Sequence, residues 1–172
     1  MTMSLKPRLK VPELSLPVVG GGTFALAQDP PATFTMLVVY RGLHCPICKT
    51  YLRDLDRKLV EFESLGVKAV AVSTDTVERA EQTKTGWGID KLSIAYGLRI
   101  EDARLWGLYV SAGIKEGEPP LFAEPGLFLI RPDDTLYAAS VQTMPFARPA
   151  MSDVLAAVKF VKEKDYPARG EA

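Results

Sequence analysis

The feature that most constrains the fold is a buried-strand pattern followed by a helical pattern and then by a second strand pattern. Residues 34–40 form an apolar, β-branched run of the kind found in a central strand buried on both faces. From Pro46 the apolar residues follow helical spacing and form one stripe: Leu52, Leu55, Leu59 and Phe62. Residues 67–73 then predict another strand. Because a strand, a helix and a strand in this order pair in parallel with a right-handed crossover, the sequence predicts an α/β fold.

The remaining patterns complete a mixed sheet with helices on both faces. An N-terminal β-hairpin is expected over residues 18–26, around the glycine turn Gly20-Gly21-Gly22, which lacks the spacing of a phosphate loop. Further helices are expected at these ranges: 77–85, with Ser73, Thr74 or Asp75 as its cap, 101–108, and 152–164. A buried strand at 126–130 with a hairpin partner at 136–141 is also expected. The glycine- and proline-rich residues 111–120 predict a mobile surface loop.

Length and composition predict a single globular domain over residues 1–172, with residues 1–12 as an extended lead-in. Lys plus Arg equals Asp plus Glu at 21 each, so the chain lacks the basic character of a nucleic-acid binder. It has no run of 18 apolar residues, so no membrane span is expected. No apolar segment follows Met1, so we expect no signal peptide and a cytoplasmic location.

The two cysteines and the single histidine fall within five residues: His44, Cys45 and Cys48. Two cysteines are too few for a disulfide scaffold, and no second Cys or His pair exists to complete a zinc site. We therefore expect thiol redox chemistry, with neither a metal nor an organic cofactor.

The Cys45-Pro46-Ile47-Cys48 motif follows a predicted buried strand and opens an amphipathic helix, which is the setting of redox-active cysteines. Pro46 suits the first helical position and places Cys45 at the N-cap, where free backbone N–H groups and the helix dipole stabilise a thiolate. We expect Cys45 to attack and Cys48, one turn deeper, to resolve. Three residues can add nearby positive charge: Arg41, His44 and Lys49. His44 is better interpreted as a neighbour of the thiolate or a solvated loop residue than as a required base.

Three stretches resemble peroxiredoxins of the AhpC/TSA type, in particular a peroxiredoxin-like branch with a C-x-x-C motif. They are residues 38–46, residues 125–130 and residues 144–148, the last of which contains a Pro-x-x-Arg motif ending at Arg148. The resemblance covers residues 10 to 165 and implies a thioredoxin fold. It also implies a thiol-dependent antioxidant enzyme that forms a Cys45–Cys48 disulfide. An external thiol, from the thioredoxin or glutathione system, would reduce that disulfide, and a homodimer is implied by the resemblance alone.

Three positions depart from the family pattern. The family has a Thr three residues before the catalytic Cys and a Pro four residues earlier, where this chain has Gly42 and Val38. The family Arg before the late strand is replaced by Pro125. Because the family Thr and Arg polarise the peroxide, Arg41 or Arg148 would have to replace them. Arg148 has a second interpretation, as a surface or core-edge salt bridge.

Pro125 keeps a second function open. It resembles the cis-proline of thioredoxins, although a loop proline that begins a strand explains it as well. Pro125 and the placement of the C-x-x-C motif together favour the first alternative, a dithiol-disulfide oxidoreductase acting on protein or glutathione disulfides. The second alternative is a non-enzymatic redox sensor or binding module on the same fold.

Overall fold

The computed structural model describes residues 5–172 and contains four helices and nine strands in that part of the chain. The helices are α1 (Pro46–Ser64), α2 (Val77–Gly86), α3 (Ile100–Leu105) and α4 (Met151–Lys164). The strands are β1 (Ser15–Pro17), β2 (Thr23–Ala25), β3 (Phe34–Val39), β4 (Val67–Val72), β5 (Ser93–Ala95), β6 (Val110–Ala112), β7 (Leu121–Ala123), β8 (Gly126–Ile130) and β9 (Leu136–Val141).

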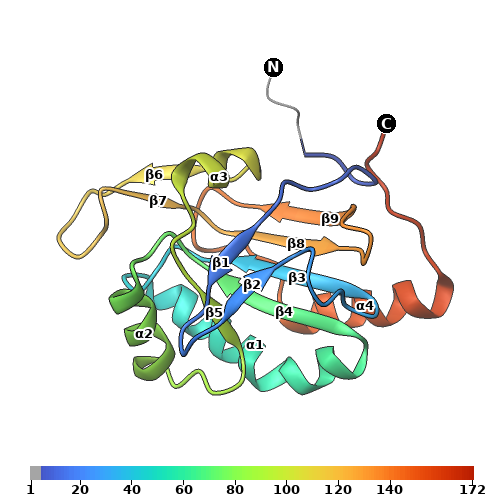
Figure 1. Ribbon diagram of the computed structural model, residues 1–172, viewed down its shortest axis with the longest axis horizontal. Helices are drawn as coiled ribbons and strands as arrows, with labels where there is room; N and C mark the ends of the chain where they lie inside the picture. The colour runs from blue at the N-terminus through green and yellow to red at the C-terminus, as the bar shows by residue number, and fades with distance from the viewer. Residues whose placement is uncertain (1–4) are drawn as a thin grey trace.

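Five of the strands form the main sheet, in the order β5-β4-β3-β8-β9 (Figure 1). β3 lies at its centre with every residue buried, as the apolar run predicts. It pairs in parallel with β4 and antiparallel with β8, and β9 is the antiparallel hairpin partner of β8. The mixed thioredoxin-like sheet expected from the sequence is therefore confirmed.

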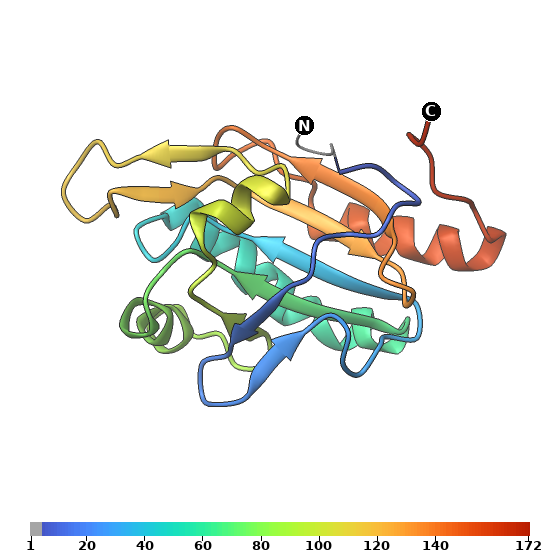
Figure 2. The same cartoon turned by 45° about the horizontal axis from the view of Figure 1, so that its top comes forward.

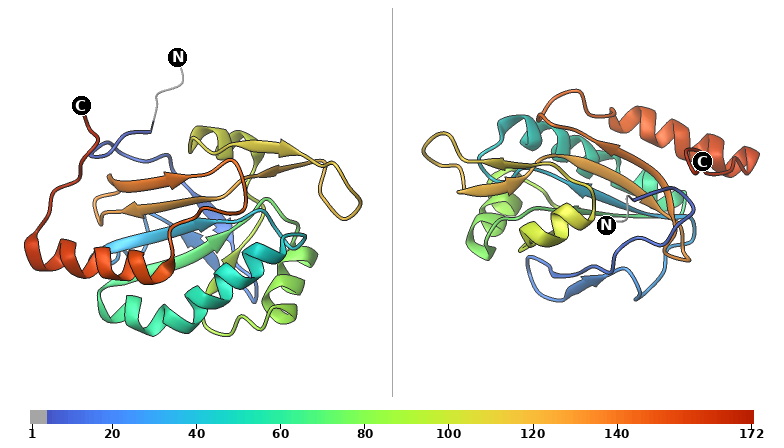
Figure 3. Two further views of the ribbon diagram at one scale, coloured as in Figure 1. Left: turned by 180° about the vertical axis from the view of Figure 1, so that it is seen from behind. Right: turned by 90° about the horizontal axis from the view of Figure 1, so that it is seen from above.

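The two faces of the sheet are covered by different kinds of structure. Helices α1 and α4 lie against one face, as the view from behind shows (Figure 3), and α2 adds Ala80 to the same core. The β1–β2 hairpin and α3 cover the other face, where Leu16, Phe24 and Trp106 are buried with residues of β3, β4 and β8. Both tryptophans, Trp87 and Trp106, are core residues.

Helix α1 follows the predicted stripe along its whole length, and each of the four stripe residues is buried. The helix ends at Ser64 with Leu65 as its C-cap, and Gly66 follows with a φ of +78°. A β-carbon at Gly66 would lie 2.6 Å from the Thr33 hydroxyl, so both the conformation and the space require glycine. The turn at Gly66 leads directly into β4 beside β3.

The structure corrects the expected loop at residues 111–120. Strands β6 and β7 pair antiparallel and form an arm that extends beyond one end of the sheet, and residues 113–120 are only its tip (Figure 2). The pairing was missed because each strand has only three residues and residues 113–120 separate them, whereas a short glycine turn marks the equally short β1 and β2. The three-residue edge strand β5 was missed because no hairpin turn accompanies it.

The predicted caps of α2 were also wrong. Thr76 is the N-cap, with its hydroxyl accepting a hydrogen bond from the Arg79 N–H at 3.4 Å. Asp75 is unavailable for capping because its carboxylate accepts the Leu43 N–H and pairs with the Arg79 side chain.

The extended lead-in over residues 1–12 is only partly described, because residues 1–4 lie outside the described part. The rest contains a turn at Pro7 and Arg8, and Lys10 then bridges to Thr135. Within residues 5–172 no helix has the length and apolar content needed to cross a membrane.

Candidate active site

Cys45 lies at the junction between the β3 loop and α1. It is the N-cap of the helix, with extended backbone angles (φ −107°, ψ 103°), and Pro46 is the first helical residue. Its sulfur accepts a hydrogen bond from the Cys48 N–H at 3.2 Å. Both cysteines are free thiols, and their exposed fractions are only 1% for Cys45 and 0% for Cys48.

The environment separates the acidities of the two thiols. A hydrogen bond from the Cys48 thiol lowers the pKa of Cys45 to about 6 against the opposing effect of burial, with help from the Cys48 N–H and the charges of Arg148 and Arg41. Burial, followed by the bond to Cys45, raises the pKa of Cys48. Cys45 is therefore the thiolate at neutral pH, and Cys48 keeps its proton.

Arg148 reaches the motif from the segment before α4. Its Nη1 donates to the Cys48 sulfur at 3.5 Å, and its guanidinium carbon lies 4.4 Å from the centre of the Tyr51 ring. The Tyr51 hydroxyl donates to the Pro149 carbonyl at 2.6 Å, so the same side chain fixes the next residue of the segment. The structure thus brings Arg148 to the cysteines, and the alternative of a surface salt bridge is wrong.

Arg41 lies close to the site but is paired. Its guanidinium contacts the Glu124 carboxylate, with a 3.0 Å ion pair at Nε and a 3.2 Å hydrogen bond from Nη2, and it also stacks on Phe122. Glu124 is buried and accepts a second hydrogen bond from the Ser111 hydroxyl at 2.7 Å. The Glu124 carboxylate balances the charge of Arg41, and the guanidinium still contributes to the lowered pKa of Cys45.

His44 is packed rather than solvated, which corrects one of its two interpretations. Its ring meets Phe122 edge to face at 4.6 Å between ring centres. Both ring nitrogens are buried without a hydrogen-bond partner in the described part of the chain. Burial and then the charge of Arg41 lower the pKa of His44, so the ring is neutral at physiological pH.

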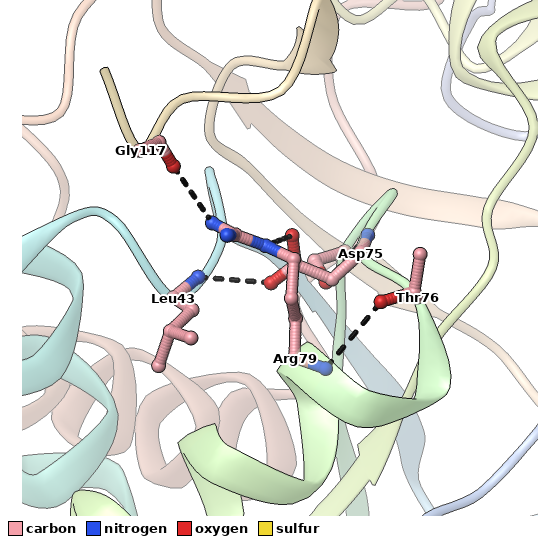
Figure 4. Close-up of polar contacts among 6 residues, drawn as sticks. Leu43, Asp75, Thr76, Arg79 and Gly117 are labelled. Atoms are coloured by element: carbon pink, nitrogen blue, oxygen red, sulfur yellow. Dashed lines mark hydrogen bonds and ion pairs between the residues drawn. The ribbon is translucent and has the colours of Figure 1, made fainter.

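At Gly42, which stands where the family has its Thr, a buried carboxylate leaves no space for a side chain. Gly42 has a φ of +135°, and a β-carbon there would lie 2.8 to 3.1 Å from the atoms of the Asp75 carboxyl group. Figure 4 shows Asp75 accepting the Leu43 N–H at 2.8 Å and pairing with the Arg79 guanidinium at 3.0 Å. Arg79 also donates to the Gly117 carbonyl at 3.2 Å, which ties α2 to the tip of the β6–β7 arm.

Pro125 is buried and precedes β8, and its carbonyl accepts the Gln142 N–H at 3.0 Å. All described peptide bonds are trans, so the comparison with the thioredoxin cis-proline is not supported and Pro125 is a proline that leads into a strand. In residues 5–172, no group of three or more His, Cys, Asp or Glu side chains is arranged to hold a metal ion.

Sequence reasoning missed Tyr51, Asp75 and Glu124. Tyr51 follows Cys48 by three residues on a helix, and this spacing places both on one face. Asp75 comes shortly after β4, and Gly42 comes shortly after β3. Because the carboxyl ends of parallel strands lie at the same edge of a sheet, this position could have indicated that Asp75 lies near the site. Glu124 is 83 residues from its partner Arg41, and no local pattern predicts that contact.

Comparison with known families agrees with this architecture. A profile of the AhpC/TSA family matches residues 7–139. This chain belongs to the AhpC/TSA family. The match includes β3, the C-x-x-C motif, β4 and β8, and this membership makes the protein an oxidoreductase of the thiol peroxidase type.

Solved structures similar to this AhpC/TSA protein include a peroxiredoxin, an AhpC and a thioredoxin peroxidase. A peroxiredoxin 6 of Arenicola marina is 18% identical, with a TM-score of 0.77 over 94% of this chain and 76% of its own. AhpC of Enterococcus faecalis is also 18% identical, with a TM-score of 0.75 over 97% and 99%. A Plasmodium yoelii protein named thioredoxin peroxidase I is 14% identical, with a TM-score of 0.74 over 94% and 92%. At these identities the likeness establishes the fold. No curated protein sequence matches the chain.

Proposed function

We propose that this AhpC/TSA protein is a thiol peroxidase in which Cys45 attacks the peroxide and Cys48 resolves the product. The Cys45 thiolate attacks the outer oxygen of ROOH, so that an S–O bond forms, the O–O bond breaks and RO− leaves. The products are a Cys45 sulfenic acid and, after RO− takes up a proton, ROH. The Cys48 sulfur then attacks the Cys45 sulfur and expels the hydroxyl group as water, which leaves a Cys45–Cys48 disulfide. Two external thiols reduce the disulfide and leave as their own disulfide.

The observation that carries the proposal is a stabilised thiolate in a nearly closed position. Cys45 has a lowered pKa and accepts the Cys48 N–H, yet its residue is only 1% exposed. A thiolate in such a place suits a small oxidant that enters the site better than it suits a large partner. The family membership points to the same chemistry.

Exchange with protein disulfides has less support. In that reaction the reduced Cys45 thiolate must itself reach the disulfide of another protein, whereas both free thiols are buried in the reduced state that the structure shows. A thioredoxin-type reductant acts instead on the oxidised Cys45–Cys48 disulfide. The trans peptide at Pro125 also removes one of the two features that favoured this alternative, and the placement of the C-x-x-C motif is the feature that is left.

The partners follow from the same cycle. The substrate is a peroxide, and the reductant is an external thiol of the thioredoxin or glutathione type. The name of the Plasmodium yoelii relative supports thioredoxin as the first reductant to test. A homodimer stays a prediction from the family resemblance alone, and a cytoplasmic location stays a prediction from the sequence.

Trapping variants separate the proposed activity from disulfide exchange. With hydrogen peroxide and dimedone, Cys48→Ser should accumulate a single adduct on Cys45, because the sulfenic acid has no resolving thiol. Cys45→Ser should give no adduct under the same conditions. A Cys48→Ser protein that resists peroxide but forms mixed disulfides with oxidised glutathione or a protein disulfide would contradict the proposal.

A further inference from the structure

We propose that Arg148 is the catalytic residue of the second half of the cycle, where its guanidinium stabilises the Cys48 thiolate. The inference rests on the proposed function, because it assigns a role within the same Cys45–Cys48 disulfide cycle. It differs from the expectation that Arg148 replaces a missing peroxide-binding side chain.

The contacts place Arg148 on Cys48. Its Nη1 donates to the Cys48 sulfur at 3.5 Å, and no hydrogen bond links it to the Cys45 sulfur. The Tyr51 ring stacks on the Arg148 guanidinium, and the Tyr51 hydroxyl donates a 2.6 Å hydrogen bond to the carbonyl of the next residue, Pro149. Cys48 and Tyr51 lie three residues apart on α1, so one helix face carries both the sulfur and the support for its cation.

Charge balance distinguishes Arg148 from the other two arginines near the site. Arg41 is paired with Glu124, and Arg79 is paired with Asp75, whose carboxyl group is fully buried. Within residues 5–172, Arg148 has no carboxylate within 4 Å, and its Nη2 is buried without a hydrogen-bond partner. A guanidinium that is shielded and uncompensated favours an anion beside it, and the atom it contacts is the Cys48 sulfur.

Two steps of the cycle create negative charge on that sulfur. In the first, Cys48 loses its proton as it attacks the Cys45 sulfenic acid, and that proton leaves with the hydroxyl group as water. In the second, an external thiolate attacks the Cys45 sulfur of the disulfide, a new S–S bond forms, and the electron pair of the broken bond goes to Cys48. Because burial makes Cys48 a weak acid, little of it is ionised for the attack, and it is a poor leaving group unless a cation stabilises its thiolate.

Rapid mixing with one equivalent of hydrogen peroxide resolves these steps. Formation of the sulfenic acid is followed by dimedone quenching, and closure of the disulfide is followed by the loss of two hydrogens in the intact mass. Arg148→Ala should slow disulfide closure about 10- to 100-fold and sulfenic acid formation less than about 5-fold. Arg53→Ala removes a charge from an exposed position of the same helix and should change neither rate. Arg148→Lys keeps the charge and should recover part of the closure rate, which a purely structural role would not predict.

A second experiment tests Arg148 independently of peroxide. Diamide closes the Cys45–Cys48 disulfide, and dithiothreitol then reduces it. Arg148→Ala should slow this reduction about 10-fold, because Cys48 is the leaving thiolate.

If the unaltered protein does not react with peroxide, the proposed function fails, and the reduction still tests Arg148. The inference is overturned if Arg148→Ala leaves both closure and reduction within about 2-fold, if it slows sulfenic acid formation as much as closure, or if Arg148→Lys is as slow as Arg148→Ala.

Discussion

At the scale of single residues, the site departs from its family for a steric reason. The position of the family Thr is occupied by Gly42, whose φ of +135° is unfavourable for any β-branched residue. The space that a side chain would fill belongs to the Asp75 carboxylate, which holds the loop before Cys45 through the Leu43 N–H. A glycine and a buried aspartate thus form one unit, so a substitution at either residue affects the other.

A comparison of the stabilities of Gly42→Ala and Gly20→Ala tests whether Asp75 fills the space beside Gly42. Both glycines have a positive φ, but a β-carbon at Gly20 has open space whereas one at Gly42 meets Asp75. Strain alone costs about 1 kcal/mol at Gly20, and overpacking adds about 2 kcal/mol at Gly42. Urea unfolding of the two variants measures the difference. Equal losses of unfolding free energy would mean that Asp75 does not fill the position.

The acidity of Cys45 gives a pH dependence with a defined sign. The rate of alkylation of Cys45 should rise as the pH increases through about 6 and be nearly constant above 7, because only the thiolate reacts. Cys48→Ala removes the largest cause of the lowered pKa and should move the midpoint upward. Iodoacetamide labelling with mass spectrometry gives both curves, and urea-unfolded protein is the reference. A native midpoint equal to that of the unfolded protein would contradict the assignment of Cys45 as the thiolate.

At the scale of elements, α1 organises the site along its length. Its first residues carry the cysteines, Tyr51 supports Arg148, and Asp56 fixes the loop before β5. The Asp56 carboxylate accepts three backbone N–H groups, from Asp90, Lys91 and Leu92, at 3.2, 2.8 and 2.8 Å. One polar residue of the helix therefore positions the edge of the sheet.

Asp56→Ala should lower the free energy of unfolding by about 3 kcal/mol, because it leaves those N–H groups unsatisfied. Asp54→Ala, on the same helix, removes only partly exposed ion pairs to Arg57 and Lys58 and should cost less than about 1 kcal/mol.

Burial raises the pKa of Asp56, but its hydrogen bonds lower it by more, so the folded pKa lies below the ordinary value of 3.8. The difference between wild type and Asp56→Ala should therefore be complete above about pH 4 and shrink as the pH falls below it. Chemical unfolding at pH 7 and pH 3 checks both statements.

The strength of each local pattern decided what could be predicted from the sequence. β3 and α1 have long periodic signals, and the N-cap place of Cys45 follows from Pro46, so these were predicted correctly. Strands β5, β6 and β7 have three residues each and carry no such signal. Contacts such as Arg41 with Glu124 and Arg148 with Cys48 join positions 83 and 100 residues apart, and only the folded sheet brings them together.

At the scale of the whole molecule, the topology gathers the site at one edge of the main sheet. The loops after the parallel strands β3 and β4 supply Gly42 and Asp75, and the residues before the antiparallel β8 supply Glu124 and Pro125. The segment before α4 returns to the same place with Arg148. Arg41 and Arg79 are paired with carboxylates, so among these three arginines only Arg148 has no carboxylate partner within residues 5–172.

The rate at which reduced wild-type protein consumes hydrogen peroxide at pH 7 tests the central claim most directly. Stopped-flow mixing gives the second-order rate constant of thiol loss, with Cys45→Ser as the control and a small free thiol, corrected to its thiolate fraction, as the reference. We predict a rate at least about 100-fold above that reference, because a site built for the reaction stabilises its transition state. A rate equal to that of the free thiolate would contradict the assignment of this protein as a thiol peroxidase.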